Sequence, residues 1–296
     1  MSNRPDALRP PVGQPDASRE SNPAADGAEA AAGGWDVDAD TLDTLVRYAD
    51  SLRESEKLPE AIAAYEQARQ FGAEPERVDY ALAALGVLPR PPHTPPDVVK
   101  SHFDDFAEVF ESHLVDTLNY RAPQCLCEAL EGVLPAHPLD VLDLGCGTGL
   151  CAPLLRPAAR RLVGVDLSER MLERAAQQGD YDELVCAEAT QMLRASPDSQ
   201  DVVVAADVLM YFGELDELFA ATHVALRAGG LFAFSAEAGD AAEIELRPNL
   251  RFAHSHGYLR KLARRHRFAV ESMAQAPIRQ ERLTDVQAHI VVLRVM

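Results

Sequence analysis

Apolar and polar positions along residues 98–296 predict strands that alternate with helices. Helical spacing predicts helices at about 101–116, at 121–134, from Ser168 and near 214–227. Short apolar runs predict strands at 139–144, 161–166, 184–187, 201–206 and 231–236. Two more runs, "RFAVESMA" and "AHIVVLRV", follow near the end without a helical crossover. This order predicts an α/β fold with a doubly wound, mostly parallel sheet, in which the terminal hairpin makes one strand antiparallel.

The chain before this pattern divides into three parts. Residues 1–38 are rich in Ala, Gly, Pro, Asp and Ser and have almost no large apolar side chain, which predicts a disordered tail. Residues 39–88 have apolar positions at helical spacing around a turn at "EKLP", which predicts a helical hairpin with a partial third helix. Residues 89–97, "PRPPHTPPD", predict an extended, proline-rich linker to the main domain at 98–296.

The first predicted strand of the main domain ends in the turn "GCGTG" at 145–149. A dinucleotide fingerprint needs its third glycine where Leu150 stands, and no Gly-Lys-Ser/Thr of a phosphate-binding loop follows. Asp143 before the turn suits a cationic ligand group better than a pyrophosphate. Asp166 ends the second strand, where an acid accepts hydrogen bonds from ribose hydroxyls. A ligand with a ribose, no phosphate and a cationic amino-acid end is S-adenosylmethionine.

These motifs resemble those of class I S-adenosylmethionine-dependent methyltransferases. "VLDLGCGTG" and "VGVDLSERML" are similar to the first two motifs of that family, and "CAEAT", "DVVVAADVLMYFG" and "LRAGGLFAFS" to its later ones. The resemblance implies a Rossmann-like, seven-stranded sheet, S-adenosylmethionine as cofactor and methyl transfer as activity. Nicotinamide oxidoreduction is the disfavoured alternative, because the glycine spacing is wrong for it.

The helical unit at 39–88 resembles one tetratricopeptide repeat, since small residues stand where its two helices would cross. With the segment "SHFDDFAEVFESHLVDTLNYRAP", it makes the chain similar to predicted bacterial methyltransferases that carry such repeats. One repeat cannot bury its own face, so it would dock a protein partner or cap the main domain. An interaction module with a cofactor-binding but non-catalytic sheet domain is therefore the alternative function.

The resemblance also implies the cofactor-binding residues. In related enzymes the upstream helices form a lid over the cofactor. This makes Phe103, Phe106, Phe110, Tyr120 and Arg121 lid candidates, with an aromatic core as the alternative for the three phenylalanines. Glu188 stands where the family more often has Asp. The candidates for cofactor binding are Tyr120, Arg121, Asp143, Gly145, Cys146, Gly147, Gly149, Asp166, Leu167, Met171, Glu188, Ala189 and Asp207.

Candidate catalytic residues follow from the chemistry of the transfer. The protein must position the acceptor and exclude water, and an amine or hydroxyl acceptor also needs a base with a pKa near neutrality. His254 and His256 in "RFAHSHGYL" lie on the substrate side by family analogy, and an extended chain would aim both to one face. Tyr211, after the fourth strand, is the third candidate. No third ligand accompanies the histidines, so a metal site is not expected.

Composition restricts the acceptor. The formal net charge of −19 disfavours nucleic acid, although "RKLARRHR" at 260–267 is locally basic. Enzymes that methylate the amino group of adenine or glutamine usually carry an Asn/Asp-Pro-Pro-Tyr/Phe run after the fourth strand, and cytosine carbon methylation needs a nucleophilic Cys after Pro in the same region. This segment has neither, so a small molecule or a protein side chain is the expected acceptor. Five cysteines without a Cys-x-x-Cys pair, no signal-peptide pattern and no apolar run of about 18 residues predict a cytoplasmic protein without membrane contact.

Overall fold

The computed structural model describes residues 38–106, 118–282 and 284–296, without the side chains of Asp105 and Phe106. Most of the predicted tail, the lid candidate Phe110 and the side chain of Phe106 therefore lie outside the described part. The chain divides into two units, residues 1–38 and 39–296. None of the described helices is long and apolar enough to cross a membrane.

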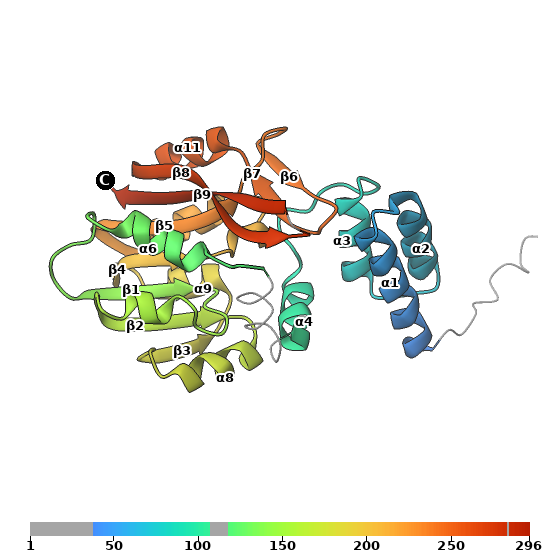
Figure 1. Ribbon diagram of the computed structural model, residues 1–296, viewed down its shortest axis with the longest axis horizontal. Helices are drawn as coiled ribbons and strands as arrows, with labels where there is room; N and C mark the ends of the chain where they lie inside the picture. Colours follow the sequence, from blue (N-terminus) through green and yellow to red (C-terminus); the bar gives the residue numbers. More distant parts are fainter. Residues whose placement is uncertain (1–37, 107–117, 283) are drawn as a thin grey trace, which may run out of the picture. The chain divides into compact units, whose positions relative to one another are not determined.

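The second unit is built on a seven-stranded sheet with the order β3-β2-β1-β4-β5-β9-β8, which Figure 1 shows from bottom to top. β1 to β5 are parallel to one another, and β9 is antiparallel to both β5 and β8. The strands are β1 (Leu139–Leu144), β2 (Ala159–Asp166), β3 (Glu183–Cys186), β4 (Gln200–Ala205), β5 (Leu226–Glu237), β8 (Phe268–Glu281) and β9 (Thr284–Val295).

Helices cover both faces of this sheet. Alternate residues of one strand point to opposite faces, so Leu142 packs into the core with α10 and α11, whereas its neighbour Val141 packs against α6 and α7. This is a doubly wound, Rossmann-like architecture. The helices are α6 (Ala122–Leu130), α7 (Ala152–Leu155), α8 (Glu169–Gln178), α9 (Ala189–Ala195), α10 (Asp216–Ala225) and α11 (His256–Arg265), with the single turn η2 (Leu209–Tyr211).

Residues 39–88 form three helices, α1 (Ala39–Glu54), α2 (Leu58–Gln70) and α3 (Pro75–Ala84). Their contact surface combines small residues, among which Ala49, Ala61 and Ala68 have no exposed surface, with the large buried side chains of Tyr65 and Leu82. The small residues let the helix axes approach closely, and the large ones fill the space beside them. The similarity to a tetratricopeptide repeat stays a prediction.

The proline-rich segment is bound to the loop after β4. The backbone N–H of Thr94 donates to the carbonyl of Tyr211 at 2.8 Å, and the carbonyl of Pro92 accepts from Gly213 and Glu214. α4 (Pro96–Phe106) begins directly behind it. These bonds place the predicted linker in the wall of the main domain.

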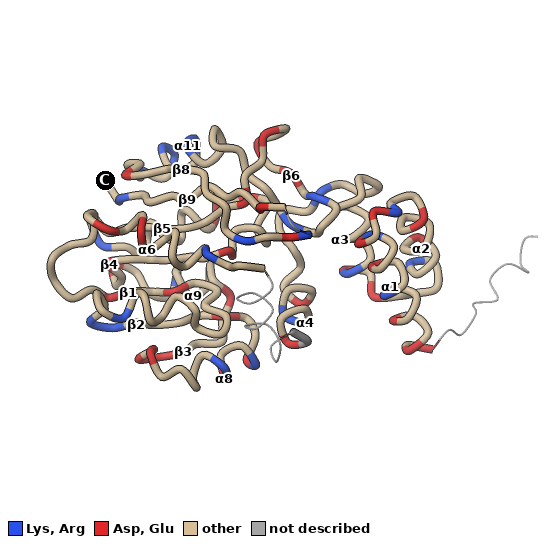
Figure 2. Tube along the Cα trace, viewed as in Figure 1, with Lys and Arg blue, Asp and Glu red and all other residues tan. Residues whose placement is uncertain are grey.

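A short hairpin, β6 (Ile244–Leu246) and β7 (Phe252–His254), was not predicted. Each strand has three residues, too few for a recognisable alternation of apolar and polar positions. α11 follows it and carries the Lys and Arg residues of the basic run 260–267 except Arg267, which lies beyond the end of the helix (Figure 2). Two of these are paired, Lys261 with Glu243 and Arg265 with Asp216.

Candidate active site

A cavity of about 710 Å³ lies at the carboxyl ends of the central strands. The turn after β1, the end of β2 and the segment from β3 to α9 form one end of it. The loop after β4, α4 and the proline-rich segment form the other end, together with two arginines from β8 and the β6–β7 hairpin. Ligands of open α/β sheets bind in this position, where the strand order reverses.

The glycine turn brings bare backbone to the cavity. Gly145, Cys146 and Gly147 line it, and both glycines have positive φ, which L side chains rarely adopt. A side chain on Gly145 would also collide with Val208. The backbone N–H of Gly147 donates to Asp166 at 2.9 Å and so ties the turn to the end of β2.

Asp166 is held in place while it faces the cavity. One carboxylate oxygen accepts from Gly147 and the other from the backbone N–H of Ser168, each at 2.9 Å. Burial raises the pKa of Asp166, although these N–H groups favour the charged form. Leu167 lines the cavity beside it, and Ser168 accepts from the N–H of Met171 as the N-cap of α8. This cap explains why the helix begins at the predicted residue.

Glu188 and Ala189 line the same end. Glu188 is the N-cap of α9, and its two carboxylate oxygens accept from the backbone N–H groups of Thr190 (2.9 Å) and Gln191 (2.8 Å). The carboxylate is therefore fixed at the rim by the start of the helix.

Four of the predicted cofactor-binding residues do not line the cavity. Gly149 makes room for Tyr181, whose ring would lie 3.2 Å from an added Cβ. Met171 is fully buried in the core, because it lies on the inner face of α8. Arg121 is exposed at the start of α6, where its backbone N–H donates to Ile278.

Asp143 is the fourth predicted cofactor-binding residue that does not line the cavity. It is 1% exposed beneath the glycine turn, where the hydroxyl of Tyr181 donates to one carboxylate oxygen at 2.7 Å. The other oxygen has no partner among the described residues. Burial raises the pKa of Asp143 to about 7. The predicted direct contact with a ligand is thus replaced by a buried hydrogen bond.

The predicted pair of histidines is not brought together at the cavity. His254 is fully buried in β7, its Nε2 donates to the carbonyl of Gly213 at 3.1 Å, and burial lowers its pKa to about 4. His256 is exposed and begins α11, because Ser255 caps that helix through the N–H of Tyr258. The extended spacing expected from the sequence is wrong, and this geometry argues against either histidine as the base.

Tyr120, Asp207 and Tyr211 also line the cavity. Burial raises the pKa of both phenols above the ordinary value of 10. At neutral pH Tyr120 and Tyr211 are therefore hydrogen-bond donors rather than bases. The lid candidate Phe103 also lines the cavity and packs edge-on against Tyr211, with 5.6 Å between ring centroids.

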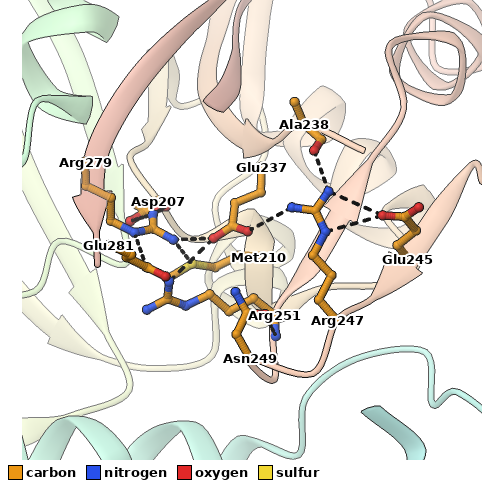
Figure 3. Close-up of polar contacts among 10 residues, drawn as sticks. All are labelled: Asp207, Met210, Glu237, Ala238, Glu245, Arg247, Asn249, Arg251, Arg279 and Glu281. Carbon is orange, nitrogen blue, oxygen red and sulfur yellow. Dashed lines mark hydrogen bonds and ion pairs between the residues drawn. The ribbon is translucent and has the colours of Figure 1, made fainter. Parts of the chain in front are cut away.

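Sequence reasoning missed an ion network behind this end of the cavity (Figure 3). Arg279 of β8 is 1% exposed and donates to both oxygens of Asp207 (2.6 and 2.7 Å), to Glu237 and to Glu281 (2.8 Å). Arg251 also contacts Glu281 and lies 3.7 Å from Glu237. The outer members are Arg247 and Glu245, which are paired at 3.3 Å.

Burial and ion pairing compete within the network. Burial raises the pKa of Glu237 despite its arginine partners. For Glu281 burial acts the same way, but the ion pairs with Arg251 and Arg279 prevail and lower the pKa. Although burial alone would lower the pKa of Arg279, its three carboxylates hold it well above the ordinary value. Arg279 is therefore a permanent cation inside the fold.

The comparisons agree with this architecture. Residues 142–234 match the family described as a methyltransferase domain. These residues are therefore similar to a methyltransferase domain, and they include the glycine turn, Asp166 and Glu188 of the cavity. No cluster of three metal-ligating side chains occurs among the described residues.

Two known proteins are similar in sequence to part of this chain. Methyltransferase-like protein 27 of Homo sapiens is 42% identical over 116 residues, which are 37% of this chain and 46% of that protein. A ubiquinone biosynthesis O-methyltransferase of Brucella melitensis is 34% identical over 101 residues, 33% of this chain and 40% of that protein. The match thus spans less than half the length of either relative.

Two solved structures share the fold. The 1,6-didemethyltoxoflavin-N1-methyltransferase of Burkholderia thailandensis, solved with S-adenosylhomocysteine, aligns with a TM-score of 0.54 at 18% identity over 71% of this chain and 93% of its own. Magnesium protoporphyrin IX methyltransferase of Synechocystis PCC 6803, solved with the same ligand, aligns with a TM-score of 0.53 at 15% identity. The alignment covers 68% of this chain and 99% of that structure's chain.

Proposed function

We propose that the chain transfers a methyl group from S-adenosylmethionine to a small molecule or to a side chain of a protein. The observation that carries this proposal is Asp166, a carboxylate fixed at the end of β2, facing the cavity beside bare glycine backbone. An acid in this position accepts hydrogen bonds from the hydroxyls of a ribose.

The residues at this end suit the cofactor. Gly145 and Gly147 let a ligand approach the backbone, and Asp166 and Glu188 supply fixed acceptors for ribose and adenine. Thr148 also lines the cavity, and its buried hydroxyl has no partner among the described residues. Such an orphaned hydroxyl is what a polar ligand would satisfy.

The bound cofactor supplies an activated methyl group on a sulfonium, so this chain's own task is to position the acceptor and exclude water. The far end of the cavity fits that task, because Val99, Phe103 and Phe212 give it an apolar wall and Tyr211 supplies a hydroxyl donor.

Replacing Asp166 with Ala is expected to weaken S-adenosylhomocysteine binding by about 2–3 kcal/mol, the range for hydrogen bonds to a charged group. Isothermal titration calorimetry measures this loss. Asp182→Ala is the matched control, because Asp182 also accepts a backbone N–H at the sheet, from Leu162 at 2.7 Å, but does not line the cavity.

Equal affinities of the two folded variants would remove Asp166 from the site. Failure of the wild-type chain to bind S-adenosylhomocysteine would contradict the proposed function itself. If the ligand binds, labelled S-adenosylmethionine added to small-molecule and protein fractions of a cell extract tests the transfer.

A further inference from the structure

Arg251 belongs to the cavity wall, and only part of its hydrogen-bonding capacity is used. It closes the β6–β7 hairpin, where its carbonyl accepts from the backbone N–H of Arg247 at 2.9 Å. Its Nη1 donates to Glu281 and lies 3.7 Å from Glu237. No described residue accepts a side-chain hydrogen bond from its Nε or Nη2. The guanidinium of this lining residue therefore has two nitrogens with unused donors.

These two nitrogens form one edge of the guanidinium. Nε and Nη2 point their N–H bonds in parallel on the side away from Nη1, which is the arrangement that holds the two oxygens of a carboxylate. In Figure 3 the guanidinium of Arg251 lies at the border of the network, against Glu281. The edge with spare donors thus matches a planar group with two acceptor atoms.

Arg279 plays a different part. Its Nε, Nη1 and Nη2 are all engaged by carboxylates, with Met210 as a further contact of Nη2 at 3.9 Å. It also donates to Glu281, the same carboxylate that holds Arg251. Arg279 therefore fixes the position of Arg251 through a shared partner, and this preorganisation lowers the entropy that a ligand would lose on binding.

The charges of the network constrain how a ligand is held. Three guanidinium groups face four carboxylates, so a bound anion gains no excess of positive charge from the cluster as a whole. Near Tyr211, however, Arg251 is the charged group with the largest effect, and it opposes the burial that raises the pKa of this phenol. Binding there depends on the paired hydrogen bonds of the fork more than on net charge.

We propose that the Nε–Nη2 edge of Arg251 is an acceptor subsite that binds a carboxylate of the methyl acceptor. The apolar body of that acceptor packs against Phe103 and Tyr211, which line the same end of the cavity. This assignment rests on the proposed function, because it places the second substrate opposite the cofactor residues. It names the substrate class as small acids with an apolar or aromatic body.

Benzoate is the probe, and benzamide is its uncharged control of the same shape. Both are titrated into the full chain with saturating S-adenosylhomocysteine and followed by calorimetry. Benzoate is expected to bind the wild-type chain, and benzamide at least about tenfold more weakly, because its NH2 group meets guanidinium donors. Arg251→Lys keeps a charge for Glu281 but loses the fork, and it is expected to weaken benzoate binding about tenfold.

Arg247→Lys is the matched control, since Arg247 belongs to the same network but does not line the cavity. It is expected to bind benzoate like the wild type. Equal benzoate affinity of Arg251→Lys and wild type, an equal loss in Arg247→Lys, or equal binding of benzamide would each overturn the subsite. If S-adenosylhomocysteine fails to bind but benzoate still depends on Arg251, the proposed function fails and the carboxylate site stands.

Discussion

Replacing Arg279 with Met is expected to destabilise the fold by about 3–5 kcal/mol, the cost of leaving one side of a buried ion network without its partner. Arg279 is 1% exposed, and its removal strands Glu237, which is equally buried, together with Asp207 and Glu281. Unfolding in urea at pH 7, followed by circular dichroism, measures the loss.

The control is Arg161→Met, which breaks an ion pair with Glu183 whose two side chains are 53% and 49% exposed. An exposed pair contributes about 0–1 kcal/mol, so this variant should unfold almost like the wild type. Adding Glu237→Gln to Arg279→Met should recover part of the stability, because one stranded charge is gone. A loss below about 1 kcal/mol for Arg279→Met would show that the network is not buried as described.

The stability of the wild-type chain relative to Asp143→Asn is expected to fall as the pH rises from about 4 to 8. The pKa of Asp143 is raised from 3.8 to about 7, so the folded state binds a proton that the unfolded state has already lost in this range. The carboxyl group stabilises the fold below its unfolded pKa, and this contribution is lost as the pH passes about 7. The interval from 3.8 to about 7 corresponds to about 4 kcal/mol.

Urea unfolding of both proteins at several pH values tests this, since Asn keeps an acceptor for Tyr181 but does not titrate. Asp182→Asn is a control of opposite sign. Its hydrogen bond with Arg156 lowers the pKa of Asp182, so its contribution is present above its ordinary pKa and is lost as the pH falls. Parallel pH curves for wild type and Asp143→Asn would mean that Asp143 is not buried.

The sequence predicts well those features that are set by neighbours in the chain. β1 has the predicted bounds because its apolar run stops at the glycines, and α8 starts after Ser168 because a serine cap acts within three residues. Asp166 is predicted at the cavity for a related reason, since it ends a strand, whereas Glu188 is predicted there from the family resemblance.

The errors concern residues whose partners are distant in the chain. Asp143 is predicted to contact a ligand, but the hydroxyl of Tyr181, 38 residues later in the chain, donates a hydrogen bond to it instead. His254 is predicted to be accessible to the acceptor, but it is buried and donates a hydrogen bond to the carbonyl of Gly213, 41 residues earlier in the chain. Arg279 stands in a polar stretch that looks like an exposed strand end. Although the terminal hairpin is predicted, no local pattern shows that β8 extends to Glu281 and brings Arg279 to Asp207.

The placement of Arg279 in β8 also affects the order in which the site can be assembled during translation. Asp207 and Glu237 leave the ribosome before their common counter-ion does, since they follow β4 and end β5. The nascent chain can therefore pair β1 with β2 and β4 while both acids stay hydrated. Arg279 can pair with these acids only after the β8–β9 hairpin has docked on the sheet. The buried ion network is therefore completed only after the β8–β9 hairpin has joined the sheet.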